Sequence, residues 1–189
     1  MRFLTKIFAI IGFLTVVGLV VAWFAGVKDL DPKAKDVYSH MAATLITTGD
    51  IAKATVVKRE VKEGIDPDDV ADSLKAVAAE MGIKSVGDLP LSKEMEARTG
   101  KKQRYIRVLS FCNPKIATDM VHYSMAFGAY LPCRVVIIED PNGKYWLYTL
   151  DLDMMIHGGK KLPPKLLEEA LRVRKTIYTM MDKAASGDF

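Results

Sequence analysis

The sequence has only two cysteines and three histidines among its 189 residues, and this scarcity excludes several kinds of site. Two thiols cannot supply a four-thiolate zinc site. Cys112 and Cys133 lie too far apart in the chain for a C-x-x-C redox motif or the C-x-x-C-H motif of a c-type haem. The pair is compatible with one disulfide or one dithiol.

The sequence also lacks a block of basic residues. Its formal net charge is +4, and Arg2 and Lys6 at the extreme N-terminus contribute half of that. Nucleic-acid binding depends on many lysines and arginines that neutralise phosphates. We therefore expect no nucleic-acid partner, and no cofactor is predicted.

One long segment, Ile7–Val27, carries no charged residue at all. As a helix, its 21 residues span roughly 30 Å, which matches the hydrocarbon core of a bilayer. Arg2 and Lys6 precede it, whereas charges of both signs follow it. The positive-inside rule therefore predicts a single-pass anchor in the inner membrane, with a cytoplasmic N-terminus and a periplasmic domain.

A cleaved signal peptide is the alternative interpretation of this segment. Val20-Val21-Ala22 has small residues at the spacing of a cleavage site. The apolar run continues past that point and is longer than a typical signal core, which favours an uncleaved anchor. Both interpretations export the domain that follows.

Period-2 and period-3.6 patterns predict the elements of that domain. Residues 1–28 are assigned to the anchor, 29–50 to a juxtamembrane linker and helix, and 51–189 to the folded domain. Strands are predicted at 52–61, 83–86, 105–111, 133–139 and 144–150, with helices at 36–48, 67–82, 114–127 and 165–185, a loop or short helix at 89–98 and a connection at 154–162. The predicted class is α+β: a two-layer sandwich with a mainly antiparallel sheet, helices packed on one face, and one transmembrane helix before it.

Five short motifs follow one another in a specific order: Asn113-Pro114-Lys115, Leu131-Pro132, Glu139-Asp140, Gly143-Lys144 and Trp146-Leu147-Tyr148. In order and spacing they resemble the family called domain of unknown function 302. The resemblance covers about a third of the chain strongly, and it does not include the membrane segment. It implies a small layered β-α-β fold, often a homodimer, and no assigned activity.

The two cysteines allow three outcomes. Cys112 precedes a helix N-terminus and Cys133 adjoins Arg134, and both settings favour a thiolate. Buried unpaired thiols, a structural disulfide and a functional thiol pair all remain open. A disulfide closing this loop would contribute about 3 kcal/mol in the chain-entropy model.

Other residues are candidates for ligand or metal binding. Met154, Met155 and His157 form a cluster of soft ligands that suits copper or haem iron, but a core methionine and a loop histidine are the favoured explanation. Asp151 and Asp153 are not expected to form a shared catalytic site, because they are predicted to lie on a strand, and alternate residues of a strand point to opposite faces. Gly158-Gly159 reads as a flexible turn. The best candidates for a ligand pocket are Asn113, Arg134, Trp146 and Tyr148.

These observations favour a non-enzymatic, membrane-anchored domain that binds a small ligand or a partner, such as a second copy or a membrane complex. The alternatives are a thiol redox or sulfur-carrier protein that uses Cys112 and Cys133, and a haem or metal binder.

Overall fold

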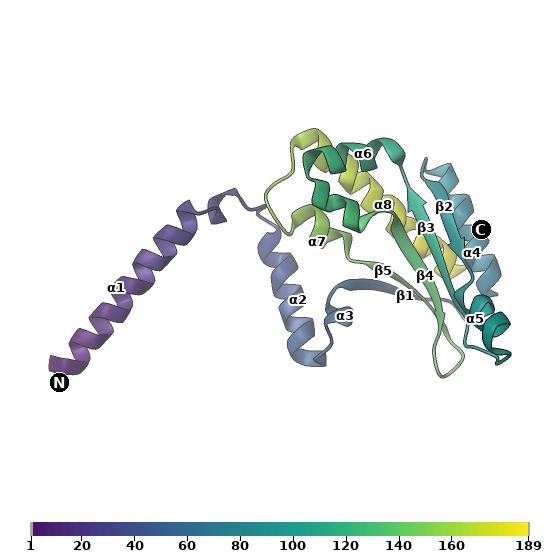
Figure 1. Ribbon diagram of the computed structural model, residues 1–189, viewed down its shortest axis with the longest axis horizontal. Coiled ribbons are helices and arrows are strands. Elements are labelled where there is room, and N and C mark those ends of the chain that lie inside the picture. Colours follow the sequence, from purple (N-terminus) through teal and green to yellow (C-terminus); the bar gives the residue numbers. More distant parts are fainter. Residues whose placement is uncertain (1, 189) are drawn as a thin grey trace.

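The computed structural model describes residues 2–188, without the side chain of Arg2, so the predicted effect of that charge on orientation lies outside the described residues. Figure 1 shows an N-terminal helix, α1 (Arg2–Phe24), that stands away from a folded body. Over Phe3–Phe24 this helix is long and apolar enough to cross a membrane, and none of it is buried. A signal sequence passes the same test of length and composition, so both roles fit this helix.

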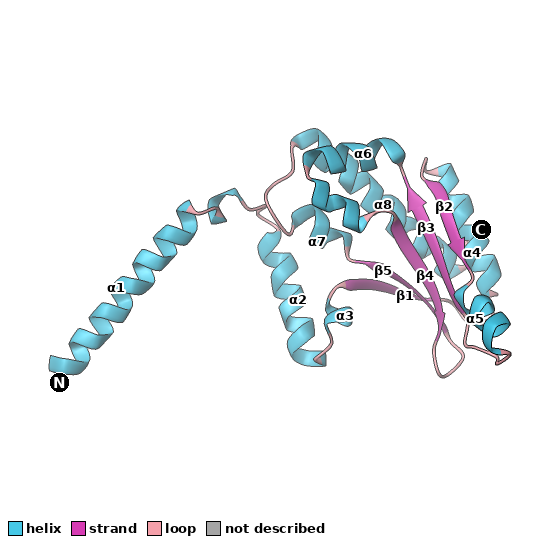
Figure 2. Ribbon diagram, viewed as in Figure 1, coloured by secondary structure: helices cyan, strands magenta, loops and turns pink. Residues whose placement is uncertain are grey.

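Five antiparallel strands form one sheet, in the order β1-β5-β4-β3-β2 (Figure 2). In the middle of the sheet, Val136 of β4 is paired with Val108 of β3 on one side and with Tyr148 of β5 on the other. A bulge between Ser85 and Gly87 shifts the register at one edge. The strands are β1 (Val56–Glu60), β2 (Lys84–Leu89), β3 (Ile106–Cys112), β4 (Cys133–Glu139) and β5 (Tyr145–Leu150).

Helices cover one face of this sheet and bury the core against it. α4 and α8 lie side by side there, and α7 and α6 follow at one end of the sheet (Figure 1). The helices of the body are α2 (Ala34–Thr48), α3 (Ile51–Ala54), α4 (Pro67–Glu80), α5 (Leu91–Thr99), α6 (Pro114–Tyr123), α7 (Leu152–His157) and α8 (Pro164–Ser186), with two short 3-10 helices, η1 (Val27–Asp29) and η2 (Met125–Tyr130).

The two layers meet through large apolar side chains that are fully buried. Leu74 of α4 and Ile177 of α8 pack in the same core as Leu109, Phe111 and Leu147 of the sheet. Burying one such side chain contributes about 1.5–3 kcal/mol relative to leaving it in water. The alternation of these positions along β3, β4 and β5 therefore determines which face carries the helices, and the predicted two-layer α+β class is confirmed.

Local capping explains where the main helices begin. The Asp66 carboxylate accepts the N–H of Asp68 at 2.7 Å at the start of α4, and Asn113 accepts the N–H of Ile116 at 3.2 Å at the start of α6. In both cases a proline occupies the first turn, where its missing N–H costs nothing. The sequence predicted both starts correctly.

The prediction for residues 52–61 was wrong in its first half. Asp50 accepts the N–H groups of Ala52 and Lys53 at 2.9 and 3.4 Å, and these bonds start the short helix α3. The strand therefore begins only at Val56. The side-chain cap outweighs an alternating pattern that would also suit a strand.

The predicted connection at 154–162 also contains a helix. Asp151 directly follows β5 and accepts the N–H of Asp153 at 3.0 Å, which starts α7 immediately after the strand. The predicted helix at 114–127 is shorter than expected, because α6 ends at Tyr123 and η2 follows.

The juxtamembrane segment is fastened to the body. Asp31 donates its N–H to the carbonyl of Gly159 at 2.9 Å, and Leu30 pairs with Lys160 in an isolated bridge. The Tyr38 hydroxyl donates to the carbonyl of Gly158. α2 consequently has a defined position beside α7, as Figure 1 shows.

Candidate functional site

A cleft of about 370 Å³ lies between α2 and the rest of the body, and charged side chains of both signs line it. One wall comes from the start of α2, with Lys33, Asp36 and His40. The other wall comes from α7, α8 and the edge strand β1. Eight of its lining side chains are polar or charged and come from three segments distant in sequence: Lys33, Asp36 and His40, then Asp151, Asp153 and His157, then Arg174 and Tyr178.

The floor of this cleft is a network of four side chains. Arg174 donates from Nη2 to Oδ2 of Asp153 at 2.6 Å, and its guanidinium lies 4.8 Å from the ring centre of Tyr178. The Tyr178 hydroxyl donates to Oδ1 of Asp151 at 3.2 Å and accepts the N–H of Leu152 at the same distance. Only one nitrogen of Arg174 is engaged, and its Nε is buried without a hydrogen-bond partner among the described residues.

This network corrects the treatment of Asp151 and Asp153 as opposed strand residues. The strand ends at Leu150, so Asp151 is the cap of α7 and Asp153 lies in its first turn. Both carboxylates therefore line the same cleft. The helix start, which the sequence analysis missed, is the reason that the two meet.

Two side chains of the floor, Tyr178 and Arg174, keep their ionisation state near neutral pH. Burial and the charge of Asp151 raise the pKa of Tyr178 well above its usual value. Burial lowers the pKa of Arg174, but the bond to Asp153 outweighs that effect and raises it overall. Proton transfer works best when a group titrates near the working pH. These two groups are therefore suited to binding rather than to acid–base catalysis.

A buried pair closes one end of the cleft. His157 Nδ1 lies 3.0 Å from Oδ2 of Asp31, and both side chains are about 5% exposed. Burial alone would raise the pKa of Asp31, but the hydrogen bonds from His157 and from the Lys33 N–H lower it. The pair joins the juxtamembrane segment to α7, and thereby the two walls of the cleft.

The predicted soft-ligand cluster is divided between two surroundings. His157 is held by Asp31, whereas Met154 and Met155 both line a second cleft together with Tyr38, and Met155 also lines an apolar cavity. Within residues 2–188 no three His, Cys, Asp or Glu side chains gather as metal ligands would. The structure therefore does not bring Met154, Met155 and His157 together.

Both cysteines are free, so the predicted alternative of a structural disulfide is not what the structure contains. Cys112 is half-buried and Cys133 is buried. Burial raises the pKa of Cys112, and burial together with the nearby Cys112 raises the pKa of Cys133 to about 11. The expectation of acidified thiols was wrong, because burial raises both pKa values and, at Cys133, outweighs the charge of Arg134.

The four residues predicted to form a ligand pocket lie in different places. Asn113 caps α6, donates to the carbonyl of Gly82 at 3.3 Å and lines the apolar cavity beside the cysteines. Arg134, Trp146 and Tyr148 alternate with the core residues of β4 and β5, so they occupy the opposite face of the sheet. The structure thus separates Asn113 from the other three, and a ligand role for each stays a prediction.

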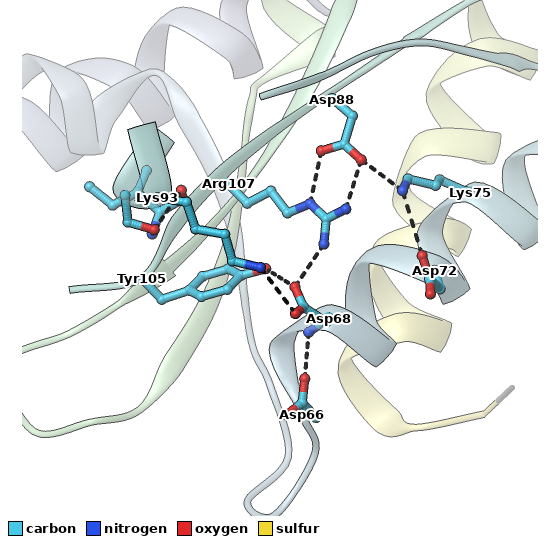
Figure 3. Close-up of polar contacts among 10 residues, drawn as sticks. Asp66, Asp68, Asp72, Lys75, Asp88, Lys93, Tyr105 and Arg107 are labelled. Atoms are coloured by element: carbon cyan, nitrogen blue, oxygen red, sulfur yellow. Dashed lines mark hydrogen bonds and ion pairs between the residues drawn. The ribbon is translucent and has the colours of Figure 1, made fainter. Parts of the chain in front are cut away.

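A second polar network, shown in Figure 3, fastens α4 to the sheet. Arg107 donates to both carboxylate oxygens of Asp88 at 2.8 and 2.7 Å and to Asp68 at 2.8 Å. Tyr105 donates to Asp68 at 2.7 Å, and Lys75 pairs with Asp88 at 2.7 Å. Its carboxylates are already bonded to neighbouring side chains, so this network has a structural role.

The family described as "Domain of unknown function DUF302" matches residues 57–184. The chain belongs to the DUF302 family. A crystal structure of an uncharacterized conserved DUF302 protein from Bacillus stearothermophilus has the same fold, with a TM-score of 0.56 and 17% identity over 69% of this chain and 98% of that chain. An uncharacterized protein of Aquifex aeolicus (strain VF5) is 24% identical over 140 residues, 72% of this chain and 90% of the relative.

The residues matched to DUF302 contain only one wall of the charged cleft. Asp151, Asp153, Arg174 and Tyr178 lie within them, whereas Lys33, Asp36 and His40 precede the first matched residue. The cleft therefore arises where the juxtamembrane helix meets the DUF302 domain.

The sequence analysis missed most of this cleft. It singled out neither Arg174 nor Tyr178 of the last helix. An arginine and a tyrosine four residues apart within an apolar stripe are an available signal, because each needs a polar partner when buried. No pattern in the sequence indicates that α2 lies opposite them.

Proposed function

We propose that the protein is a membrane-tethered, exported DUF302 domain that binds a small polar ligand without chemically changing it. The ligand would bind in the cleft between α2 and the α7–α8 wall. The observation that supports this proposal most directly is the convergence of charged side chains from three distant segments on one open cleft of about 370 Å³.

The charges of the cleft favour a small molecule that carries both signs. Arg174 has donors that Asp153 does not use, and these suit an anionic group such as a carboxylate. Asp36 and Lys33 stand exposed on the opposite wall, where Asp36 would accept from an amine. A free amino acid has both groups, and its size suits a cleft of this volume.

The place of the cleft next to α1 supports capture of this ligand close to a bilayer. η1 and the start of α2 follow α1 directly in the chain, and Asp31 fixes that segment to the body. A tethered domain of this kind would act as an accessory to a membrane complex. The exported location remains part of the proposal.

Calorimetric titration of the full chain in detergent tests the proposal, with the twenty free amino acids as probes. Dicarboxylates and polyamines serve as comparators that carry only one sign of charge. We expect at least one amino acid to bind, and Arg174→Gln to weaken that binding about tenfold or more, since a hydrogen bond to a charged group contributes about 1.5–3 kcal/mol.

Lys175→Gln is the matched control, because Lys175 is an exposed cation on the same helix and does not line the cleft. It should bind as the unmodified chain does. Equal affinity of the Arg174→Gln and Lys175→Gln variants would contradict the proposed site, and absence of binding by every amino acid would contradict the ligand class.

A further inference from the structure

Four sulfur-containing side chains surround one small cavity at the end of the sheet where α6 begins. Cys112 ends β3, Cys133 begins β4, Met120 comes from α6 and Met155 from α7. The rest of the lining is almost entirely apolar, with Asn113 as its one amide. These elements meet only in the folded chain, so the sulfur atoms are gathered by the tertiary structure.

We infer that this cavity is a binding site for a single Cu(I) ion, with Cys112 and Cys133 as thiolate ligands and Met120 and Met155 as thioether ligands. The site is separate from the charged cleft, and the inference does not depend on the ligand proposed there.

The kinds of donor in the cavity select the metal. Thiolate and thioether sulfur are soft ligands that favour Cu(I), whereas Mg²⁺, Ca²⁺ and Mn²⁺ require oxygen ligands. No histidine, aspartate or glutamate lines this cavity. A site of this composition therefore disfavours the hard divalent ions.

The size of the cavity also limits what can bind. Its volume is about 30 Å³, and a single water molecule needs about 10–15 Å³ measured in the same way. One dehydrated metal ion fits this space, whereas haem does not. Cys112 is only half-buried, so the ion can enter from its side.

Binding conserves charge and needs no change of oxidation state. Cu⁺ and two protonated thiols give one Cu(I) bis-thiolate and release two protons, while the thioethers donate lone pairs without losing a proton. The bound unit carries one negative charge. Arg134, the next residue after Cys133, carries a positive charge on the other face of the same strand.

Competition with a Cu(I) chelator tests the inference on the full chain, reduced and kept in detergent without oxygen. The protein is titrated with Cu(I) against bicinchoninate, whose copper complex absorbs visible light. We expect the protein to retain one copper per chain, with only sulfur neighbours in the X-ray absorption spectrum. Cys112→Ser and Cys133→Ser should each weaken retention at least tenfold, and Met155→Leu should weaken it less.

Met154→Leu is the matched control, since Met154 is the adjacent residue but lines a different cleft. Circular dichroism shows whether each variant is folded, and Cys112→Ser decides the matter if Cys133→Ser fails to fold. Loss of all copper to the chelator, unchanged retention by Cys112→Ser, or nitrogen and oxygen neighbours around the metal would each overturn the inference.

Discussion

At the scale of single residues, the stability of the fold depends on ionisable side chains whose pKa values are shifted by their surroundings. Asp88 is the clearest case. The hydrogen bonds from Arg107 lower its pKa, burial opposes them and Lys75 adds to them, so that the pKa falls from 3.8 to about 2. In the same network, burial raises the pKa of Tyr105 to about 12. Such a group links the stability of the fold to pH.

The lowered pKa of Asp88 predicts a loss of stability in acid. A carboxylate with a lower pKa in the folded state stabilises the fold above its unfolded value, 3.8, and this contribution disappears as the pH falls towards 2. The difference corresponds to about 2 kcal/mol. Chemical denaturation of the protein between pH 5 and 2 measures it.

Two substitutions distinguish the contribution of the Asp88 carboxylate to stability from that of an exposed aspartate nearby. Asp88→Asn should cost about 2 kcal/mol at pH 7, because it removes the carboxylate that accepts two of the three hydrogen bonds of the Arg107 guanidinium, whose side chain is only 16% exposed. It should also flatten the acid transition. Asp72→Asn is the control, since Asp72 is 77% exposed and lies 3.5 Å from Lys75. A surface pair contributes under about 1 kcal/mol. Equal effects of the two changes would contradict the assignment.

At the scale of elements, the position of α2 decides whether the charged cleft exists. Apart from α3, which follows it in the chain, this helix touches the body through α7. The contacts that hold it there include the Asp31–His157 pair, the Tyr38 hydroxyl on the carbonyl of Gly158, and the Asp31 N–H on Gly159. Without them, the wall that carries Lys33, Asp36 and His40 would be free to move.

Removal of the Asp31 carboxylate tests this attachment. Asp31→Ala leaves His157 buried without its partner, at a cost of about 1–3 kcal/mol. We expect amide hydrogen exchange to become about tenfold faster over α2, while α4 and the central strands stay protected. Asp29→Ala is the control, because Asp29 is exposed and contacts the body through its backbone carbonyl. Unchanged exchange over α2 in the Asp31→Ala variant would show that other contacts hold the helix.

At the scale of the whole molecule, the apolar helix α1 and the layered body behave as separate parts. α1 is exposed along its length, whereas the body buries its apolar side chains between α4, α8 and the sheet. This division is expected of an anchor that delivers a self-contained domain to one side of a bilayer.

The orientation of that domain can be measured with reporter fusions. Alkaline phosphatase joined after Phe189 should be active, because it folds only in an oxidising compartment. The mass of the mature chain should include residues 1–28 if α1 is an uncleaved anchor. An inactive phosphatase fusion, together with a fluorescent cytosolic fusion, would place the domain inside and contradict the exported location.

Much of the fold was predictable because its signals are local. Asp66-Pro67 and Asn113-Pro114 marked helix starts, and Asp140 with Gly143 marked the hairpin, where Gly143 adopts a φ of 80°. The short helices α3 and α7 were missed because six residues or fewer carry no helical period. In both, the signal was a single aspartate, Asp50 or Asp151, that caps the first turn.

The sequence by itself determined the apolar N-terminal segment, the five strands and the layered class, because these depend on hydrophobic patterns and on neighbouring residues. Only the tertiary structure decided which functional groups meet. Asp151 and Arg174 share a cleft, Met155 joins Cys112 and Cys133, and Met154 does not. These contacts depend on how the helices pack on the sheet, because that packing brings together side chains from distant parts of the chain.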